Sequence, residues 1–429
     1  MTARTIAPIE GPLDADVAVP GSKSLTNRGL VLAALAEGTS TLRGALVADD
    51  TEAMAAAMAT LGARVDLDPG VCRVAGFGGR PLPGPLTIDA RLSGTTSRFV
   101  LPLLVLGEGP YVVDGDPPLR ERPMGPTLDA LRRLGAEVDD AARPGHLPVV
   151  VSGSQIHGER LEIDGSTSSQ FTSGLLLAGA MFPDGLTVEL TGEVVSRPYL
   201  DMTVEVLRAF GVDATSDGDR RYRVRPGGPE PTDYAIEPDA SAASYFFAAA
   251  MICGGQVRVE GLGRASLQGD LAVVEVFEAM GAVVDRRREA TAVTGPTVIH
   301  GIDVDLADMP DMAQTVAAVA VFAEGPTRVR GVGVIRGHET DRIAAVVTEL
   351  RRCGIAADEH DDGFTVHPGR PRPTVIETYH DHRMAMSFAL LGLRAGGIAI
   401  ADPDCVAKTV PDFFDRLDRL RMPSSAPGG

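Results

Sequence analysis

The chain has 429 residues, and 44% of them are hydrophobic, so it can bury two sizeable cores within normal domain sizes. Its 58 acidic residues outnumber 40 basic ones, and the formal charge of −18 argues against a nucleic-acid partner. No signal peptide, transit peptide or apolar span of about 18 residues is visible, and the four cysteines show neither metal nor redox spacing. We therefore expect a cytoplasmic protein without a membrane partner.

The first polar cluster lies at residues 20–28, which read Pro-Gly-Ser-Lys-Ser-Leu-Thr-Asn-Arg and precede an apolar run. This pattern predicts a loop that enters a helix, with Ser22 or Ser24 as its N-cap. Hydroxyls, two cations and free amide groups at a helix N-terminus would hold a carboxylate or a phosphate. A Walker A loop needs a glycine directly before its lysine, so an ordinary P-loop ATPase is disfavoured.

Lysine is nearly absent from the chain. Lys23 and Lys408 are the only two lysines among its 40 basic residues. A lysine is a compact point charge that the planar guanidinium of arginine does not imitate. The alternative is that the composition favours arginine and that these two lysines remain by chance. The polar neighbours of both lysines favour anion sites instead.

A repeat of about 72 residues runs through the chain. Polar segments that precede small, apolar helices begin near Lys23, Ser93, Ser166, Asp239, Asp308 and Asp381. Amphipathic helices alternate with them and end at Gly62, Gly135, Gly211, Gly281 and Gly354, which suit a left-handed helix stop. Each unit would contain one buried helix, one outer helix and short strands between them, as at Tyr111–Val113 and Leu186–Leu190. The fold class is therefore α/β, with six copies of one unit.

The six units divide best into three and three. The turn-rich residues 215–231 separate the third unit from the fourth, either as a hinge or as a long hairpin, and the repeat favours a boundary near Asp239. The sixth unit lacks a closing glycine and a strand, which residues 4–9 could supply. We predict one domain at residues 22–238 and a discontinuous domain at residues 1–21 and 239–429.

Two further clusters carry chemistry. Residues 338–342 read His-Glu-Thr-Asp-Arg, and residues 379–386 lead into an apolar helix through His380, Asp381, His382 and Arg383. A lone cluster of this kind is more often a solvated helix face, but two of them followed by Lys408 favour a site. A metal at His380 and His382 is disfavoured, because alternate residues at a helix start diverge.

Several motifs together strongly resemble 5-enolpyruvylshikimate-3-phosphate (EPSP) synthases. They are residues 20–24, 119–123, 168–170, 196–199, 339–342, 381–386 and 407–409. The resemblance runs in order from about residue 5 to residue 416 and implies two domains of three β-α units, an inside-out α/β barrel, with the active site in the interdomain cleft. It also implies transfer of the enolpyruvyl group of phosphoenolpyruvate to the 5-hydroxyl of shikimate 3-phosphate, in the shikimate pathway to chorismate and the aromatic amino acids. Neither a metal nor an organic cofactor is implied, and we expect a monomer.

The resemblance assigns the site residue by residue. Residues implied to contact shikimate 3-phosphate are Lys23, Ser24, Arg28, Ser168, Ser169, Gln170, Ser196, Tyr199, Asp311 and His338. Those implied to surround phosphoenolpyruvate are Lys23, Gly94, Arg122, Gln170, Arg342, Arg383 and Lys408. Asp311, Glu339 and Lys23 are the acid-base candidates, and the sequence leaves open which of them handles each proton. The domain at 22–238 would mainly hold shikimate 3-phosphate, and the discontinuous domain would mainly supply acid-base groups and phosphoenolpyruvate contacts.

Three positions depart from the familiar pattern of the family. His338 replaces a lysine expected near the substrate phosphate, Val334 replaces an asparagine, and Leu92 replaces the asparagine of an Asn-Ala-Gly-Thr loop. The main rival is the sister enzyme that acts on UDP-N-acetylglucosamine, which usually carries a cysteine in the loop equivalent to residues 116–124, where this chain has none. A rival from another class is a catalytically dead anion-binding scaffold, against which the intact Lys23, Asp311, Glu339 and Arg383 argue. The resemblance also implies inhibition by glyphosate in competition with phosphoenolpyruvate.

Overall fold

The structure is a computed structural model that describes residues 3–152, 156, 160–218 and 220–421. The chain divides into two compact units. We call Gly21–Glu237 the central unit, and Met1–Pro20 with Pro238–Gly429 the split unit. Both boundaries lie one residue from those expected from the sequence. Each unit has its own hydrophobic core, and no helix in the described part of the chain is long and apolar enough to cross a membrane.

The described residues of the central unit form three four-stranded sheets. In sheet order their strands are β14 (Asp233–Ala235), β3 (Thr39–Arg43), β5 (Val71–Ala75) and β4 (Arg64–Asp68); β6 (Leu86–Asp89), β7 (Tyr111–Asp114), β9 (Val149–Ser152) and β8 (Glu137–Asp139); and β10 (Arg160–Asp164), β11 (Leu186–Thr191), β13 (Arg221–Val224) and β12 (Ala214–Asp217). In every sheet the first two strands pair in parallel and the others pair antiparallel.

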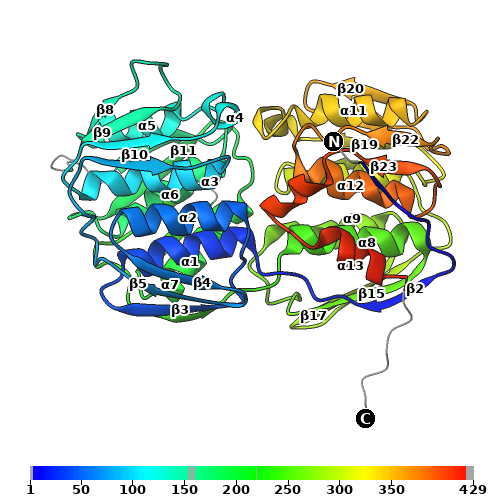
Figure 1. The fold of residues 1–429 in the computed structure, drawn as a ribbon, viewed down its shortest axis with the longest axis horizontal. Helices are drawn as coiled ribbons and strands as arrows, with labels where there is room; N and C mark the ends of the chain where they lie inside the picture. Colours follow the sequence, from blue (N-terminus) through cyan, green and yellow to red (C-terminus); the bar gives the residue numbers. More distant parts are fainter. Residues whose placement is uncertain (1–2, 153–155, 157–159, 219, 422–429) are drawn as a thin grey trace, which may run out of the picture. The chain divides into compact units, whose positions relative to one another are not determined.

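Three helices form the interior of the central unit, and their residues are almost all buried. They are α1 (Lys23–Leu35), α3 (Gly94–Leu103) and α6 (Ser169–Gly179). They contact one another, which explains why they are apolar on all sides. Figure 1 shows strands β8 and β9 on one side of these helices in the view and β3 on the other. The amphipathic helices are α2 (Asp49–Thr60), α5 (Gly125–Arg133) and α7 (Pro198–Ala209), and shorter turns are α4 (Pro117–Arg120) and the 3₁₀ helix η1 (Leu104–Leu106).

The split unit repeats this plan, with two strands that come from the N-terminal segment Met1–Pro20. Its sheets contain β2 (Leu13–Asp16), β15 (Gly255–Glu260), β17 (Ala290–Gly295) and β16 (Val283–Arg286); β18 (Asp303–Asp305), β19 (Thr327–Arg330), β21 (Gly363–Val366) and β20 (Ala357–His360); and β1 (Arg4–Thr5), β23 (Ile398–Ile400) and β22 (Thr374–Ile376). Its buried helices are α8 (Ala240–Cys253), α10 (Ala313–Ala320) and α12 (His382–Gly392), and its outer helices are α9 (Val273–Ala279), α11 (Arg342–Arg352) and α13 (Phe413–Arg419). The 3₁₀ helices are η2 (Gly269–Ala272), η3 (Pro310–Met312), η4 (Gly333–Gly337) and η5 (Pro403–Lys408).

The structure confirms the repeat. The five predicted helix-stop glycines all have positive φ, from 78° at Gly354 to 115° at Gly62. The predicted strand near the N-terminus is also present, because β1 pairs antiparallel with β23, although it covers only Arg4–Thr5. The turn-rich residues after the third outer helix begin with the hairpin of β12 and β13, so this stretch belongs to the third sheet before it leads to the boundary.

Candidate active site

Lys23 is the first residue of α1, and Ser22 is its N-cap, whose hydroxyl accepts a hydrogen bond of 3.4 Å from the Leu25 amide. The Lys23 Nζ atom lies 3.1 Å from Oδ2 of Asp50, a buried residue in the first turn of α2. Sequence reasoning did not identify Asp50, since only the packing of α1 against α2 brings it to the lysine. The carboxylate fixes the ammonium group at the helix N-terminus.

Gly94 and Arg122, which come from different segments, are close neighbours. A Cβ atom built on Gly94 would lie 2.8 Å from Nη1 of Arg122 and 2.9 Å from its Cζ. Gly94 begins α3 after the N-cap Ser93, whose Oγ accepts a hydrogen bond of 3.1 Å from the Thr96 amide. The absence of a side chain at this position therefore gives the Arg122 guanidinium its room.

The N-terminus of α6 adds a second polar group to the central unit. Ser168 caps this helix by accepting a hydrogen bond of 3.3 Å from the Gln170 amide. The Gln170 side chain accepts a 2.8 Å hydrogen bond from Arg98 and donates one of 3.4 Å to Thr95. Arg98 is buried and was not among the predicted residues, although it stands inside the polar segment of the second repeat. Ser169 is buried at the start of the same helix, and Ser196 has a left-handed backbone with φ of 54°.

Arg28 is enclosed rather than presented to solvent. Its guanidinium donates hydrogen bonds to the Thr203 hydroxyl at 2.8 Å, the Ser24 carbonyl at 3.0 Å, the Tyr199 carbonyl at 3.1 Å and the Ser173 hydroxyl at 3.2 Å. A guanidinium has five N–H donors, so at most one is left for a ligand. Burial lowers the pKa of Arg28 to about 10, which keeps it charged at neutral pH.

The split unit contains a cluster of alternating charges, which we call the Arg342 cluster. Its members are Asp311, His338, Glu339, Arg342, Asp381, Arg383 and Lys408. Arg342 is 1% exposed and lies at its centre, donating to Asp311 Oδ1 at 2.7 Å, Glu339 Oε2 at 2.9 Å and Asp381 Oδ2 at 2.7 Å. Three carboxylates thus surround one arginine at the start of α11.

Asp311 and Glu339 each bridge Arg342 to a second cation. The other oxygen of Asp311 accepts a 2.8 Å hydrogen bond from Arg383, and Glu339 Oε1 lies 3.2 Å from the Lys408 Nζ atom. The two predicted acid-base residues are therefore close to all three predicted cations of the split unit. The sequence did not identify Asp381 as a site residue, although it begins the motif at residues 381–386. It caps α12 through the Arg383 amide at 2.8 Å while it holds Arg342.

The electrostatics of this cluster favour a charged Asp311. Burial would raise the pKa of Asp311, but the charge of Arg383, the His338 ring 3.6 Å away and the charge of Arg342 hold it well below the ordinary value. Burial lowers the pKa of His338, and the neighbouring Asp311 carboxylate only partly opposes this. Burial also disfavours the charge of Arg342, but Asp381, Glu339 and Asp311 raise its pKa above the ordinary value. At neutral pH the cluster contains a neutral histidine and an ionised Asp311.

Of the other positions noted in the sequence, His382 contacts this cluster, because its Nδ1 atom lies 3.7 Å from Oδ1 of Asp381. His380 pairs with Asp402 at 2.6 Å, and His382 is buried in α12. No group of three His, Cys, Asp or Glu side chains in the described residues could hold a metal ion. Leu92 is exposed, and Val334 lies in η4, where it packs against the core of the split unit.

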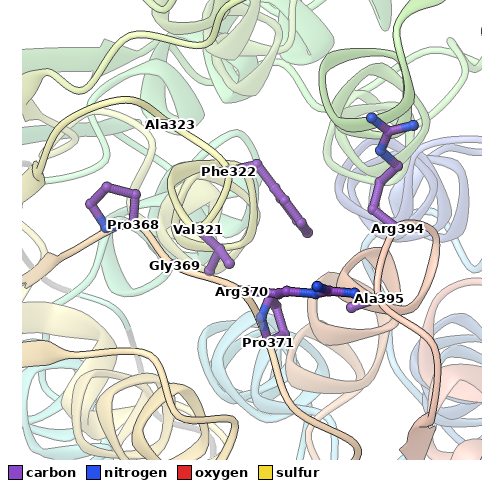
Figure 2. Close-up of a pocket in the computed structure, with 9 residues that line it drawn as sticks. All are labelled: Val321, Phe322, Ala323, Pro368, Gly369, Arg370, Pro371, Arg394 and Ala395. Carbon is purple, nitrogen blue, oxygen red and sulfur yellow. The ribbon is translucent and has the colours of Figure 1, made fainter.

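A pocket of about 480 Å³ lies elsewhere in the split unit. It is lined at the C-terminal ends of α10 and α12 by Phe322, Arg370, Arg394 and six neighbouring residues. In Figure 2 the Arg370 side chain reaches toward Ala395, whereas Arg394 points away. The Arg342 cluster is at the N-terminal ends of the same helices, and α12 is 11 residues long, or about 16 Å. This pocket is therefore separate from the candidate active site.

Comparison with known proteins identifies the family. The model of EPSP synthase (3-phosphoshikimate 1-carboxyvinyltransferase) matches residues 8–417. The chain belongs to the EPSP synthase family. It is 43% identical over 423 residues to the 3-phosphoshikimate 1-carboxyvinyltransferase of Trichormus variabilis, covering 98% of this chain and 99% of the relative. The enzyme of the same name from Serratia proteamaculans is 41% identical over 427 residues, with 98% of both chains covered.

Solved structures agree with this assignment. The EPSP synthase of Acinetobacter baumannii superposes with a TM-score of 0.83 at 28% identity, covering 98% of both chains. An enolpyruvyl transferase from Streptomyces tendae superposes with a TM-score of 0.78 at 20% identity over 97% of both chains, which shows a shared fold. The predicted two-domain enolpyruvyl transferase fold with its six repeated units is confirmed, and so is the membership of a family of transferases.

Proposed function

We propose that this chain is a 3-phosphoshikimate 1-carboxyvinyltransferase, which transfers the enolpyruvyl group of phosphoenolpyruvate to the 5-hydroxyl of shikimate 3-phosphate and releases phosphate. The observation that carries the proposal is the Arg342 cluster. Asp311 lies between Arg342 and Arg383, and Glu339 lies between Arg342 and Lys408. The proposed acid-base groups therefore contact the cations that would bind the anionic substrates. Such an arrangement suits a reaction between two anionic substrates, because preorganised cations offset their repulsion.

In the central unit, we assign the binding of shikimate 3-phosphate to Lys23, Ser24, Arg28, Ser168, Ser169, Gln170, Ser196 and Tyr199. The capped starts of α1 and α6 support this assignment, because a helix N-terminus favours a negative ligand. Arg28 would use its remaining N–H on the substrate and would otherwise orient Ser24 and Tyr199 through their carbonyl groups. From the split unit, His338 and Asp311 would complete this substrate's contacts.

Phosphoenolpyruvate would be surrounded by Lys23, Gly94, Arg122, Gln170, Arg342, Arg383 and Lys408. The close approach of Gly94 to Arg122 supports a tightly limited space for this small anion. The paired states of Lys23, Arg342, Arg383 and Lys408 support the same role, since each cation already has a carboxylate that holds it in place. A bound phosphate or carboxylate would compete for these cations.

The chemistry consists of an addition followed by an elimination. The 5-hydroxyl oxygen attacks C2 of phosphoenolpyruvate while the hydroxyl loses its proton and C3 gains one, which gives a tetrahedral intermediate. The bond from C2 to the phosphate oxygen then breaks, and C3 loses a proton to restore the double bond. Asp311 would take the hydroxyl proton, and Glu339 would donate and remove the proton at C3. Lys23 stays an alternative donor or acceptor.

Asp311 is too weak a base while three groups depress its pKa. When phosphoenolpyruvate engages Arg383 and Arg342, the carboxylate loses part of their positive charge, and its pKa rises toward the range useful for proton transfer. Substrate binding would thereby activate the base. This order of events explains why the acid-base residues form ion pairs with the cations that would bind the substrates.

Phosphate release with each substrate alone and with both tests the proposal. Only the pair should release phosphate, and Glu339→Gln should reduce turnover by roughly a hundredfold or more. Glu359→Gln, which removes an exposed carboxylate on β20, is the matched control and should leave turnover unchanged. Turnover with UDP-N-acetylglucosamine in place of shikimate 3-phosphate would identify the sister activity, and no turnover with either acceptor would indicate a scaffold.

A further inference from the structure

A buried carboxyl group is linked to Arg383 by hydrogen bonds that the proposed chemistry does not use. Asp270, in η2, is 3% exposed and accepts a short hydrogen bond from the Ser241 hydroxyl in the first turn of α8. The Ser241 oxygen in turn accepts a hydrogen bond of 3.5 Å from Nη2 of Arg383. A chain of two hydrogen bonds therefore runs from the guanidinium to a carboxylate that the proposed mechanism does not use.

The local structure holds this carboxylate in place. Gln268, just before η2, accepts a 2.9 Å hydrogen bond from the Ala240 amide and donates one of 2.7 Å to the Pro238 carbonyl. These bonds attach η2 to the N-terminus of α8, where the helix dipole favours a negative charge. The position of the Asp270 carboxyl group is thus fixed by its surroundings, and it is not a surface acid.

The direction of the hydrogen bonds makes Ser241 a donor to Asp270 and an acceptor for Arg383. A serine hydroxyl has a single proton, and in this arrangement it points to Asp270. The lone pairs of the oxygen then face Arg383, and the carboxylate strengthens them as acceptors. The same Nη2 atom donates a 2.8 Å hydrogen bond to Asp311, which must be released to act as a base. After that release, Ser241 and Asp270 still hold the guanidinium, together with the Tyr245 hydroxyl at 3.5 Å.

We propose that Asp270 is a positioning residue that acts through Ser241 to hold the Arg383 guanidinium in the orientation that binds phosphoenolpyruvate. This inference rests on the proposed function, since it assigns Arg383 to that substrate. Asp270 touches neither substrate. Its loss should therefore weaken the binding of one substrate and spare the other.

Steady-state kinetics of Asp270→Asn, Ser241→Ala and the double variant, with each substrate varied, test the proposal. Each single variant should raise KM for phosphoenolpyruvate by roughly tenfold and leave KM for shikimate 3-phosphate within about twofold of the parent. The double variant should be no worse than either single variant, because both changes break one chain. Ser241→Thr keeps the hydroxyl and should restore KM.

Asp285→Asn, which removes an exposed carboxylate of the same unit, is the control and should change neither constant. Equal increases in both KM values, additive effects in the double variant, or an unchanged KM for phosphoenolpyruvate would overturn the positioning role. If Asp270→Asn does not fold, as judged by its thermal unfolding, Ser241→Ala and Ser241→Thr carry the test alone. A parent protein that turns over neither acceptor would instead overturn the proposed function.

Discussion

At the residue scale, Gly94 gives the sharpest prediction, because its missing side chain leaves room for Arg122. In Gly94→Ala the new Cβ would lie within 3.0 Å of three guanidinium atoms, so the arginine must move. We expect KM for phosphoenolpyruvate to rise roughly tenfold, as for a weakened charge-assisted hydrogen bond, and glyphosate inhibition to weaken as well. Inhibition curves of both proteins measure this.

Gly125→Ala is a matched control, since a Cβ at that glycine has no neighbour within 4 Å. It should bind both ligands as the parent does. Equal glyphosate inhibition of the parent and Gly94→Ala would remove Gly94 and Arg122 from the site.

The protonation of His338 should make the binding of shikimate 3-phosphate depend on pH. Its pKa is lowered in the ligand-free protein, and the Arg342 Nη1 atom at 3.1 Å fits a neutral, accepting Nδ1. A dianionic phosphate beside the ring would raise that pKa, so binding should take up a proton. Affinity for shikimate 3-phosphate is then highest below the free-state pKa and falls as pH rises to the bound-state pKa, by about tenfold to a hundredfold in all.

Titration calorimetry from about pH 5.5 to 9, in two buffers of different ionisation enthalpy, measures both the affinity and the proton uptake. His338→Lys should take up no proton over most of this range and keep a flat affinity. Parallel affinity curves for the two proteins would mean that His338 does not contact the phosphate.

Single residues also mark the limit of what the sequence predicts. Lys23 and Lys408 are identifiable because they are rare and stand in polar motifs, and the structure gives each a carboxylate partner. Asp50 and Asp270 carry no such signal. Their neighbours in sequence are ordinary, and only the packing of α2 on α1, or of η2 on α8, brings them to a cation or a hydroxyl.

At the scale of elements, the N-terminus of α12 combines a helix cap with a buried ion pair. Asp381 is fully buried, accepts the Arg383 amide and receives two hydrogen bonds from Arg342. Asp381→Ala leaves Arg342 without one of its carboxylates, so we expect a loss of about 3 kcal/mol or more in the free energy of unfolding. Asp381→Asn keeps the cap and should lose less. Urea denaturation of the variants measures both.

Asp341 is the matched control, since it caps α11 with a 3.0 Å hydrogen bond from the Ala344 amide but is 42% exposed. Asp341→Ala should lose only about 1 kcal/mol. Similar losses in both alanine variants would mean that Asp381 stabilises the protein as a cap alone.

Elements were predictable where the pattern was local. The apolar helices and the glycines after the amphipathic helices follow from short-range rules, so their positions were correct. In the fifth unit the polar segment that begins near Asp308 includes a 3₁₀ turn, Pro310–Met312, and α10 begins directly after it at Ala313. β2 and β14 were not predicted, since each is a short strand whose partner, β15 or β3, is about 190 residues or more away in sequence.

At the scale of the whole molecule, the proposed function needs residues of both units on one pair of substrates. Ser168, Tyr199 and Gly94 belong to the central unit, and Asp311 and Arg383 belong to the split unit. The chain passes between the units twice, after Pro20 and after Glu237. Ligands that engage both groups would therefore favour a closed arrangement of the units over an open one, in proportion to their differential affinity for the two.

Small-angle X-ray scattering tests this consequence. The radius of gyration should decrease when shikimate 3-phosphate and glyphosate are added together, because the two ligands would supply the anions that the cations of both units bind. Gly94→Ala should compact less at the same glyphosate concentration, since its binding of that ligand is weakened while both units stay intact. An unchanged radius in the saturated parent protein would contradict ligand-driven closure, and it would leave the reaction to be explained by a site already assembled before the substrates bind.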